Sequence, residues 1–546
     1  MRSIKRFTAL LLALLMVFSL TGCSFLNFGQ DFDTLLRGGG VKFFDMEYTR
    51  PDLDDMRSCV ASICDMLKEG AGYRRVTDAL DEFYGYYWSF YTMSTLAELR
   101  SDLDTSDEYY AEEYEYCMDA DAEVSALFDE LMLACTDSDL KDELDNHYFG
   151  GMLESNYAGW YENGMERLME LYAQEAELLG DYREKLIEFY SVEDVEEAYR
   201  TYNPEIAQIY IDLIKVRKDI AAEVGYDSYE ELAYADFGRE YTPDDLEDYL
   251  AAIEEYIIPL FFAADEKGIL ETAYDNLSPS APKDSLKTVK DTVSAMDEKL
   301  GKAMNYMTEY ELYSVIESAD KLEGSYTTYI DDYNSPFLFV NPECYEEDIL
   351  TIAHEFGHFC DAYENYDTNY NLDTSEVMSQ GMEYLLLCNL QDSKLQKKLT
   401  SFKMTDALYV YVNQACFNEF EHRAFALPDE ELTVGNLNAI YAELAGKYGF
   451  GDGYGDVVGL SWIDINHIFE YPFYVISYCV SDSAAFGIYL MELENPGSGL
   501  KAYLEAMKDA PNMDFLDLME DKGITSPISA ETIKNIAETV SENLGL

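Results

Sequence analysis

The sequence predicts a mainly α-helical protein, and three observations support this fold class. From about Met46 to Glu271, apolar residues are spaced as in amphipathic helices whose outer faces are acidic. The alternation of apolar and polar residues that is typical of strands is rare. The 47 Tyr and 28 Phe residues supply apolar surface for a core, so the acidic composition does not indicate a disordered chain.

Two stretches carry the signals of helix starts. In Ser191-Val-Glu-Asp194 and in Thr242-Pro243-Asp244-Asp245, a hydroxyl residue precedes an acid by three positions, and the second stretch has Pro at the first helical position. We therefore expect helices to begin after Ser191 and Thr242. Residues 276–285 contain two Pro and three Ser, which predicts a loop before the next helix.

The best strand candidate is the run from Pro336 to Asn341. It is short, aromatic and β-branched, and Pro336 and Pro342 bound it. It lies just ahead of a pair of histidines in the sequence.

The first residues have the composition of a secretion signal. Three basic residues precede an apolar run from Phe7 to Leu20, which is too short to span a bilayer. The following Leu20-Thr21-Gly22-Cys23 resembles the lipobox of bacterial lipoproteins. That resemblance implies that residues 1–22 are a lipoprotein signal peptide, that Cys23 is lipidated, and that the protein is anchored outside the cell at a bacterial membrane. An ordinary secretion signal with an incidental cysteine is the alternative.

Residues 23–40 end in three glycines and are expected to form a flexible tether between the lipid and the folded body. Loss of the three basic residues with the signal would change the formal net charge from -71 to -74. Such an excess of acid excludes nucleic acid as a partner, because phosphates would be repelled. It favours cationic ligands, although a solvated acidic surface without ligand preference is the commoner explanation.

The cysteines do not form a recognisable framework. Nine follow Cys23, an odd number, and no Cys-x-x-Cys pair occurs. Buried free thiols are therefore expected, with one or two disulfide bridges as the alternative.

The stretch Thr351–Cys360 holds two of the five histidines of the chain. Residues four apart lie on one face of a helix, so His354 and His358 can both direct a ring nitrogen at one ion. Glu355 projects to the side of this face and can reach a water held by the ion. This arrangement predicts a zinc site at which a carboxylate takes a proton from the attacking water.

A catalytic zinc site needs a third protein ligand and an open position. Metzincin motifs place Gly and His seven and ten residues after the first His, where this chain has Asp361 and Glu364, so that class is excluded. Glu376 is the best candidate, because Ser379, Gln380 and Glu383 follow it on one face of an otherwise apolar helix. We expect Glu376 to bind the metal and Glu383 to support the ligands. A solvated helix face is the alternative.

These residues resemble the thimet oligopeptidase and oligoendopeptidase F family of zinc metallopeptidases, and more closely its oligoendopeptidase F branch. The resemblance begins with His354-Glu355-Phe356-Gly357-His358 and Glu376-x-x-Ser379-x-x-x-Glu383. It continues in three further stretches, which are 217–226, 414–421 and 462–478. The matching stretches therefore extend from Arg217 to Tyr478.

The family resemblance implies a two-lobed helical zincin-type peptidase with a deep central channel and a small β-sheet beside the active-site helix. It implies one Zn²⁺ ion held by His354, His358 and Glu376, with Glu355 as the general base. Residues 201–546 would form the catalytic domain and residues 41–200 an N-terminal helical region. The strand at 337–341 would be the edge along which a peptide substrate pairs.

A second group of residues is implied by the same resemblance. Hydrolysis needs hydrogen-bond donors that face the oxyanion formed when water attacks a carbonyl. The resemblance assigns this role to His467 and to tyrosines that follow it, with Tyr478 favoured over Tyr471 and Tyr474. A packed structural histidine is the alternative for His467.

The sequence thus supports the hypothesis of a lipid-anchored, zinc-dependent metalloendopeptidase that hydrolyses short peptides. We expect a monomer whose contact with the membrane is made through the lipid alone. A catalytically silent peptide-binding lipoprotein on the same scaffold is the main alternative, although a binder would not need Glu355. A structural zinc module, with four closed protein ligands, is the second alternative.

Overall fold

The structure is a computed structural model that describes residues 40–153, 165–365, 371–450 and 455–546. The predicted signal peptide, Cys23 and nearly all of the predicted tether lie outside the described residues. The described residues fold mainly into helices, which confirms the predicted fold class. The family resemblance also implied a deep channel, and that feature stays a prediction.

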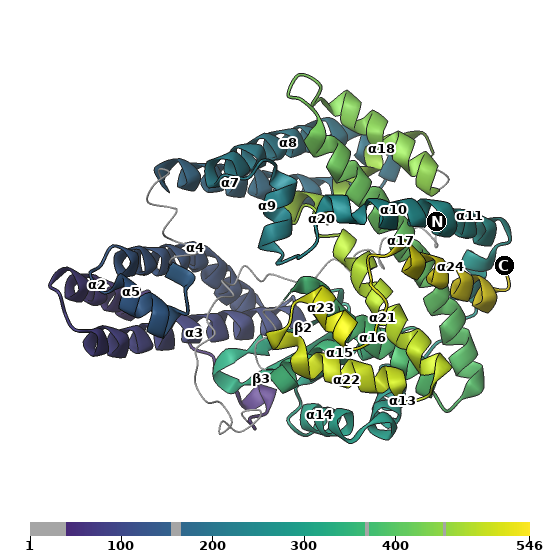
Figure 1. Cartoon of the computed structure of the whole chain (residues 1–546), viewed down its shortest axis with the longest axis horizontal. Helices are drawn as coiled ribbons and strands as arrows, with labels where there is room; N and C mark the ends of the chain where they lie inside the picture. Colours follow the sequence, from purple (N-terminus) through teal and green to yellow (C-terminus); the bar gives the residue numbers. More distant parts are fainter. Residues whose placement is uncertain (1–39, 154–164, 366–370, 451–454) are drawn as a thin grey trace.

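The chain is built from helices that are interrupted once by a small sheet (Figure 1). In the first half, the α-helices are α2 (Leu53–Lys68), α3 (Tyr73–Leu103), α4 (Glu108–Thr136), α5 (Lys141–Leu144), α7 (Met165–Tyr190), α8 (Val195–Val224), α9 (Tyr229–Asp236), α10 (Glu247–Ala252), α11 (Ile258–Glu266), α12 (Ile269–Asp275), α13 (Pro282–Met296) and α14 (Glu298–Glu309). After the sheet follow α15 (Asp348–Asn365), α16 (Leu372–Asn389), α17 (Ser393–Ala426), α18 (Val434–Tyr448), α20 (Asn466–Glu470), α21 (Ile476–Glu494), α22 (Ser498–Asp509), α23 (Phe515–Asp521) and α24 (Ala530–Leu544).

Short 3₁₀ and π segments connect or extend these helices. The 3₁₀ segments are η2 (Phe43–Asp45), η5 (Pro243–Leu246), η7 (Asp331–Tyr333), η8 (Gly455–Asp464) and η9 (Ala510–Asn512), and the π segments are η3 (Asp145–Phe149) and η6 (Ile253–Ile257). The predicted helix start at Thr242 is confirmed, because Thr242 and Asp245 form a capping box with Pro243 at the first position. The start predicted at Ser191 is displaced. Asp194 caps α8 instead, and its side chain accepts from the backbone N–H of Glu197.

The sheet contains three strands in the order β1 (Tyr313–Val315), β3 (Ser335–Asn341), β2 (Gly324–Ile330). Strand β3 corresponds to the predicted strand, which is therefore confirmed. It pairs with β1 in parallel and with β2 in antiparallel register. The expectation that this strand forms the substrate-pairing edge is wrong, because both of its edges are occupied. Of the described strands, β2 is the one that lies at a sheet edge beside the histidine helix α15.

The first helices form a unit with its own hydrophobic core. Helices α2 to α5 project from one side of the body (Figure 1), and their core includes Leu80, Phe83, Val124 and Leu131. The far end of α3 belongs instead to the main core, where Leu96 is buried. The domain boundary expected at residue 200 stays a prediction, and α8 runs through that position.

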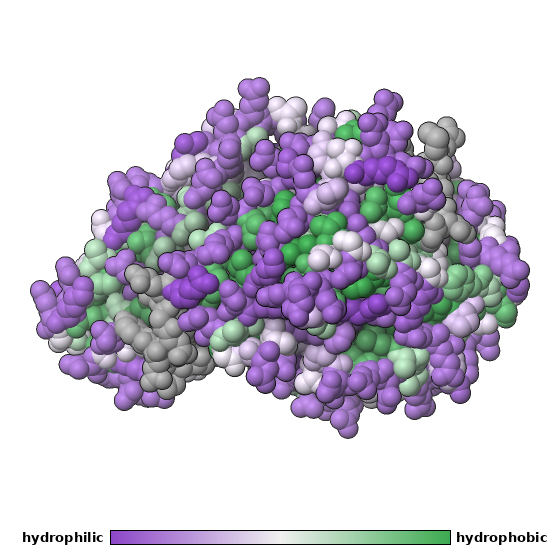
Figure 2. All heavy atoms as spheres, turned by 90° about the horizontal axis from the view of Figure 1, so that it is seen from above, coloured by the Kyte–Doolittle hydropathy of each residue, from purple (hydrophilic) through white to green (hydrophobic). Residues whose placement is uncertain are grey.

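The main core extends over all later helices and the sheet. It buries Trp462 and the apolar faces of α15, α16, α17 and α21. One face of the molecule is covered largely by hydrophilic side chains, with apolar atoms between them (Figure 2). Among the helices of the described ranges, none has the length and apolar character that crossing a bilayer requires.

Candidate metal centre and active site

The candidate site is built on two adjacent helices, α15 and α16. The glycine between the two histidines, Gly357, lets the helices approach closely. A Cβ atom on Gly357 would lie 2.7 Å from Ser379 Cα on α16 and closer still to the carbonyl oxygen of Met378. The spacing of four residues puts His354 and His358 on the face of α15 that meets α16, and their ring centroids are 5.1 Å apart.

Three side chains from these helices converge on one point. His354 Nε2 lies 3.8 Å and His358 Nε2 lies 3.9 Å from Glu376 Oε2. The ligand atoms of the three residues all lie within 4.8 Å of one another. Glu376 is 1% exposed, and the hydroxyl of Ser379 donates to its Oε2 over 3.1 Å. Two imidazole nitrogens and one carboxylate form a donor set that suits a divalent cation such as zinc.

The environment of His358 also fits a metal ligand. Its Nε2 is buried and has no hydrogen-bond partner among the residues that the structure describes. Burial, together with the charge of His354, holds the pKa of His358 well below its usual value. A neutral imidazole with an unpaired buried nitrogen is what metal coordination requires.

His354 is oriented by a carboxylate on its other side. Its Nδ1 lies 2.9 Å from Glu383 Oε1, so Nε2 is directed at Glu376. Burial lowers the pKa of His354, but the hydrogen bond and charge of Glu383, with the charges of Glu355 and Glu376, outweigh it and raise this pKa to about 9. A cation at the site would compete with that proton.

Glu383 is itself held by a buried lysine. Lys403 on α17 places its Nζ 2.8 Å from Glu383 Oε2 and 3.3 Å from Asp406 Oδ2. Burial raises the pKa of Glu383, but the charges and hydrogen bonds of Lys403 and His354 outweigh burial and hold it below its usual value. The ionised carboxylate thus fixes the orientation of His354.

Glu355 lies on the side of α15 that faces the sheet. The hydroxyl of Thr327 on β2 donates to Glu355 Oε2 over 2.9 Å. Burial raises the pKa of Glu355 to about 7, whereas the positive charge of His354 and hydrogen bonds from Thr327 and Ser325 act in the opposite sense. A carboxylate with a pKa near neutrality can both accept and return a proton at physiological pH.

The predicted third histidine lies in a cluster of tyrosines. Tyr478 OH is 3.5 Å from His467 Nε2, and the ring centroid of Tyr474 is 5.5 Å from that of His467. Burial raises the pKa of Tyr478, and the charge of Glu376 adds to this effect. The ring centroid of Tyr471 is 6.2 Å from that of Tyr474, and the two rings are tilted by 53°.

Burial lowers the pKa of His467 to about 4, so its ring is neutral at physiological pH. Two of the five histidines of the chain, His354 and His358, belong to the metal-ligand cluster, and His467 lies in the tyrosine cluster. The other two, His147 in η3 and His422 in α17, lie in other parts of the fold.

Sequence reasoning missed the residues that support the site. Thr327 and Ser325 belong to a strand that was not predicted, although Gly324–Ile330 is rich in Thr and Tyr. Lys403 is a cation inside an apolar run of α17, between Phe402 and Met404, which is a readable signal for a buried charge with a partner.

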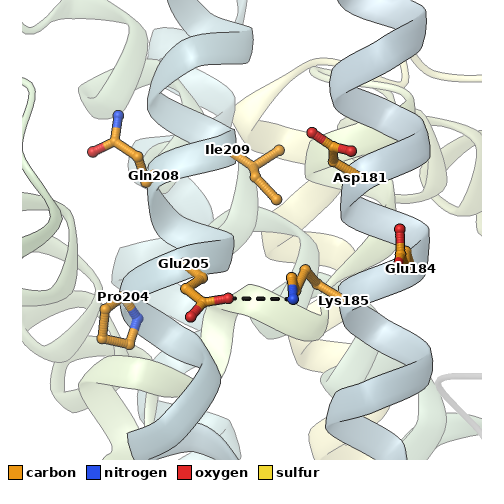
Figure 3. Close-up of a pocket in the computed structure, with 7 residues that line it drawn as sticks. All are labelled: Asp181, Glu184, Lys185, Pro204, Glu205, Gln208 and Ile209. Carbon is orange, nitrogen blue, oxygen red and sulfur yellow. Dashed lines mark ion pairs between the residues drawn. The ribbon is translucent and has the colours of Figure 1, made fainter.

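A separate cavity of about 520 Å³ lies between α7 and α8 (Figure 3). Three of its seven lining residues are acidic, and Lys185 pairs with one of them, Glu205, at 3.4 Å. It contains none of the predicted site residues and does not contribute to the candidate metal centre.

Two family profiles and one curated relative match parts of the chain. A profile described as the peptidase M3 N-terminal domain matches residues 43–155, and a profile described as peptidase family M3 matches residues 292–537. Oligopeptidase PepF of Bacillus subtilis (strain 168) is 28% identical over 251 residues. That alignment covers 43% of this chain and 37% of the relative.

Solved structures share the fold over nearly the whole chain. PZ peptidase A, solved with an inhibitor, has a TM-score of 0.75 at 21% identity, and the alignment covers 92% of this chain and 99% of that structure. A Bacillus anthracis str. Ames protein classed as an oligoendopeptidase F has a TM-score of 0.71 at 20% identity, with coverage of 92% and 98%. At these identities the likeness shows the fold alone, which is mainly α-helical with a small sheet.

Proposed function

The chain belongs to peptidase family M3, and we propose on this premise that it is a zinc-dependent metalloendopeptidase that hydrolyses short peptides. The observation that carries the proposal is the convergence of His354, His358 and Glu376, whose ligand atoms lie within 4.8 Å of one another, with Glu355 beside them. A three-ligand site with an adjacent acid fits a catalytic metal better than a closed structural one.

The donor set would hold one zinc ion, which would supply Lewis acidity toward water and toward the substrate carbonyl. Glu355 would take the proton of the attacking water and pass it to the leaving amine, since its pKa of about 7 suits both transfers. Thr327 restrains Glu355 Oε2, so the carboxylate is held in one orientation. Tyr478 and the neutral His467 would donate hydrogen bonds to the oxyanion.

We propose that the substrate backbone pairs along β2. This strand is at the edge of the sheet, and its Thr327 contacts the general base, so an extended peptide added there would run past Glu355. Backbone pairing of this kind recognises extended peptides and not folded proteins, which supports short peptides as the substrate class.

The test is digestion of a mixed library of short peptides by a lipid-free form of the protein, residues 24–546, supplied with one equivalent of zinc. Mass spectrometry of the products should show internal cleavage, and Glu355→Gln should abolish it while it retains zinc by elemental analysis. Return of every peptide intact by both proteins would overturn the proposal in favour of a peptide-binding protein. Unfolding of the chain by a chelator would indicate a structural zinc instead.

We also propose that the protein is attached to the outer face of a bacterial membrane through a diacylglycerol on Cys23. The support is the signal-like run of residues 1–22 and the lipobox resemblance that ends at Cys23. Expression of the full chain and of Cys23→Ser in a bacterial host, followed by membrane fractionation and mass spectrometry of the N-terminal peptide, tests this. A lipid-free N-terminal peptide in the full chain would contradict it.

A further inference from the structure

The segment that carries His467, Tyr474 and Tyr478 is held in an unusual backbone conformation. We call residues 466–478, from the start of α20 to the beginning of α21, the tyrosine arm. At its centre, Phe473 has a φ of +66°, in the left-handed region that favours glycine. A bulky residue stays in this region only where neighbouring groups hold it there.

Two buried side chains from distant parts of the chain hold the two peptide groups of Phe473. Its N–H donates to Glu421 Oε1 on α17 over 2.8 Å. Its carbonyl oxygen accepts from Arg239 Nη2 over 2.9 Å. Arg239 is 8% exposed and Glu421 is fully buried, so water does not compete for these bonds.

The same Arg239 nitrogen reaches the rest of the turn. It lies 3.3 Å from the carbonyl oxygen of Tyr474 and donates to the hydroxyl of Ser477 over 2.7 Å. Ser477 directly precedes Tyr478. Arg239 therefore fixes the backbone on both sides of Tyr474 and immediately before Tyr478.

The other side of Arg239 is connected to the metal-ligand helix. Its guanidinium lies over the rings of Tyr234, at 4.4 Å, and Tyr241, at 5.8 Å. The hydroxyl of Tyr241 donates to Asp373 Oδ2 over 2.7 Å. Asp373 is in the first turn of α16, three residues before Glu376. The stretch 239–241 thus contacts both the tyrosine arm and the helix that supplies the third metal ligand.

We propose that Arg239 is a positioning residue that sets the distance between the tyrosine arm and the metal centre, with Glu421 holding the opposite side of the same peptide. This inference rests on the proposed function, because it assigns Arg239 an effect on peptide hydrolysis through Tyr478. Donors to an oxyanion act only when they are placed within a few tenths of an ångström, so their backbone support affects the rate.

The first test compares Arg239→Lys with wild type in peptide hydrolysis. Lysine keeps the charge, but its side chain is one atom shorter, so its ammonium nitrogen does not reach the position from which Arg239 Nη2 contacts three acceptors. We expect kcat to fall by about 10- to 100-fold with little change in KM, since oxyanion contacts form only in the transition state. The matched control is Arg100→Lys, because Arg100 also donates to a backbone carbonyl, that of Met46, but does so in α3.

A double-mutant cycle separates positioning from a general loss of stability. If Arg239 acts through Tyr478, then adding Arg239→Lys to the Tyr478→Phe variant should lower kcat by less than about threefold. Full additivity of the two losses would overturn the inference. Glu421→Leu, which removes the acceptor of the Phe473 N–H, should show the same non-additivity, whereas Glu421→Gln should keep most of the activity.

Hydrogen–deuterium exchange gives a readout that does not depend on catalysis. Peptides that cover residues 469–478 should exchange faster in Arg239→Lys than in wild type, with no such change in Arg100→Lys. If wild type hydrolyses no peptide but this exchange pattern is observed, the proposed function is wrong. The restraint of the tyrosine arm by Arg239 would still be supported. Unchanged exchange in residues 469–478 of Arg239→Lys would refute that restraint, whatever the activity of the variant.

Discussion

The backbone of Gly357 on α15 lies so close to that of Ser379 on α16 that a Cβ atom at residue 357 would be 2.7 Å from Ser379 Cα. Gly357 stands between the two histidines, and Ser379 holds Glu376 by a hydrogen bond. The contact between these two residues therefore sets the separation of the metal ligands on the two helices.

Gly357→Ala should weaken both folding and metal binding. The added methyl group must separate the helices, and overpacking of this kind costs about 1–3 kcal/mol of stability. Thermal unfolding and zinc titration of the purified variant measure the two effects. Gly446→Ala in α18 is the control, because nothing lies within 4 Å of its added Cβ, and it should leave zinc affinity unchanged.

Glu355→Gln should remove hydrolysis while leaving the metal in place. The amide cannot take a proton from water, and loss of a general base lowers kcat by about 10²- to 10⁴-fold. Steady-state hydrolysis and elemental analysis of the same preparation measure the two properties. Glu364→Gln, near the end of the same helix, should retain normal activity. A wild-type rate in Glu355→Gln would exclude it as the base.

Lys403→Met should lower zinc affinity although Lys403 does not touch the ligands. Its removal leaves the buried charge of Glu383 without a cation, so His354 loses its fixed orientation. Loss of such support typically costs about 10- to 100-fold in metal affinity. Lys397→Met, at an exposed position of the same helix, is the comparison for isothermal titration with zinc. Equal affinities in the two variants would contradict the role of Lys403.

Tyr478→Phe should lower kcat by about 100-fold with a small change in KM, as expected for loss of one oxyanion donor. The basis is the position of Tyr478, whose hydroxyl is 3.5 Å from His467 Nε2 and whose pKa responds to Glu376. Tyr471→Phe should have a smaller effect, because the ring of Tyr471 contacts that of Tyr474, whereas the hydroxyl of Tyr478 lies beside His467. The opposite order of kcat values would assign the donor role to Tyr471.

Asp102→Asn should change how stability depends on pH. Burial raises the pKa of Asp102 to about 7, while the hydroxyl of Tyr326 donates to it over 2.6 Å and opposes that shift. The folded state therefore holds a proton that the unfolded state releases near pH 4, so folding becomes less favourable as pH rises from about 4 to about 7. The variant should have a higher melting temperature than wild type at pH 8 and a similar one at pH 4.5. Asp78 is exposed on the same helix, so Asp78→Asn should leave the melting temperature unchanged at both pH values.

The parts of the site that depend on local spacing could be predicted from the sequence. His354, Glu355 and His358 follow from helical geometry. Glu376 follows from the polar side chains that lie three, four and seven positions after it on one face of α16. The helical fold class and β3 were predicted correctly for the same reason. Each depends on periodicity within one element.

The parts that depend on pairing between distant segments could not be predicted. Strand order decided that β2, and not β3, is the edge, and no periodicity within either strand contains that information. The contact of Arg239 with Phe473 joins residues 234 positions apart, and the left-handed turn at Phe473 has no glycine to mark it.

The small number of imidazoles gives this protein a built-in set of spectroscopic probes. A sample labelled with ¹⁵N only at histidine would contain five rings, of which His354 and His358 report on the metal-ligand cluster and His467 on the tyrosine arm. His147 and His422 lie elsewhere and serve as internal references. Titration of such a sample would resolve tautomer, protonation and metal occupancy ring by ring in a chain of 546 residues, with almost no spectral overlap.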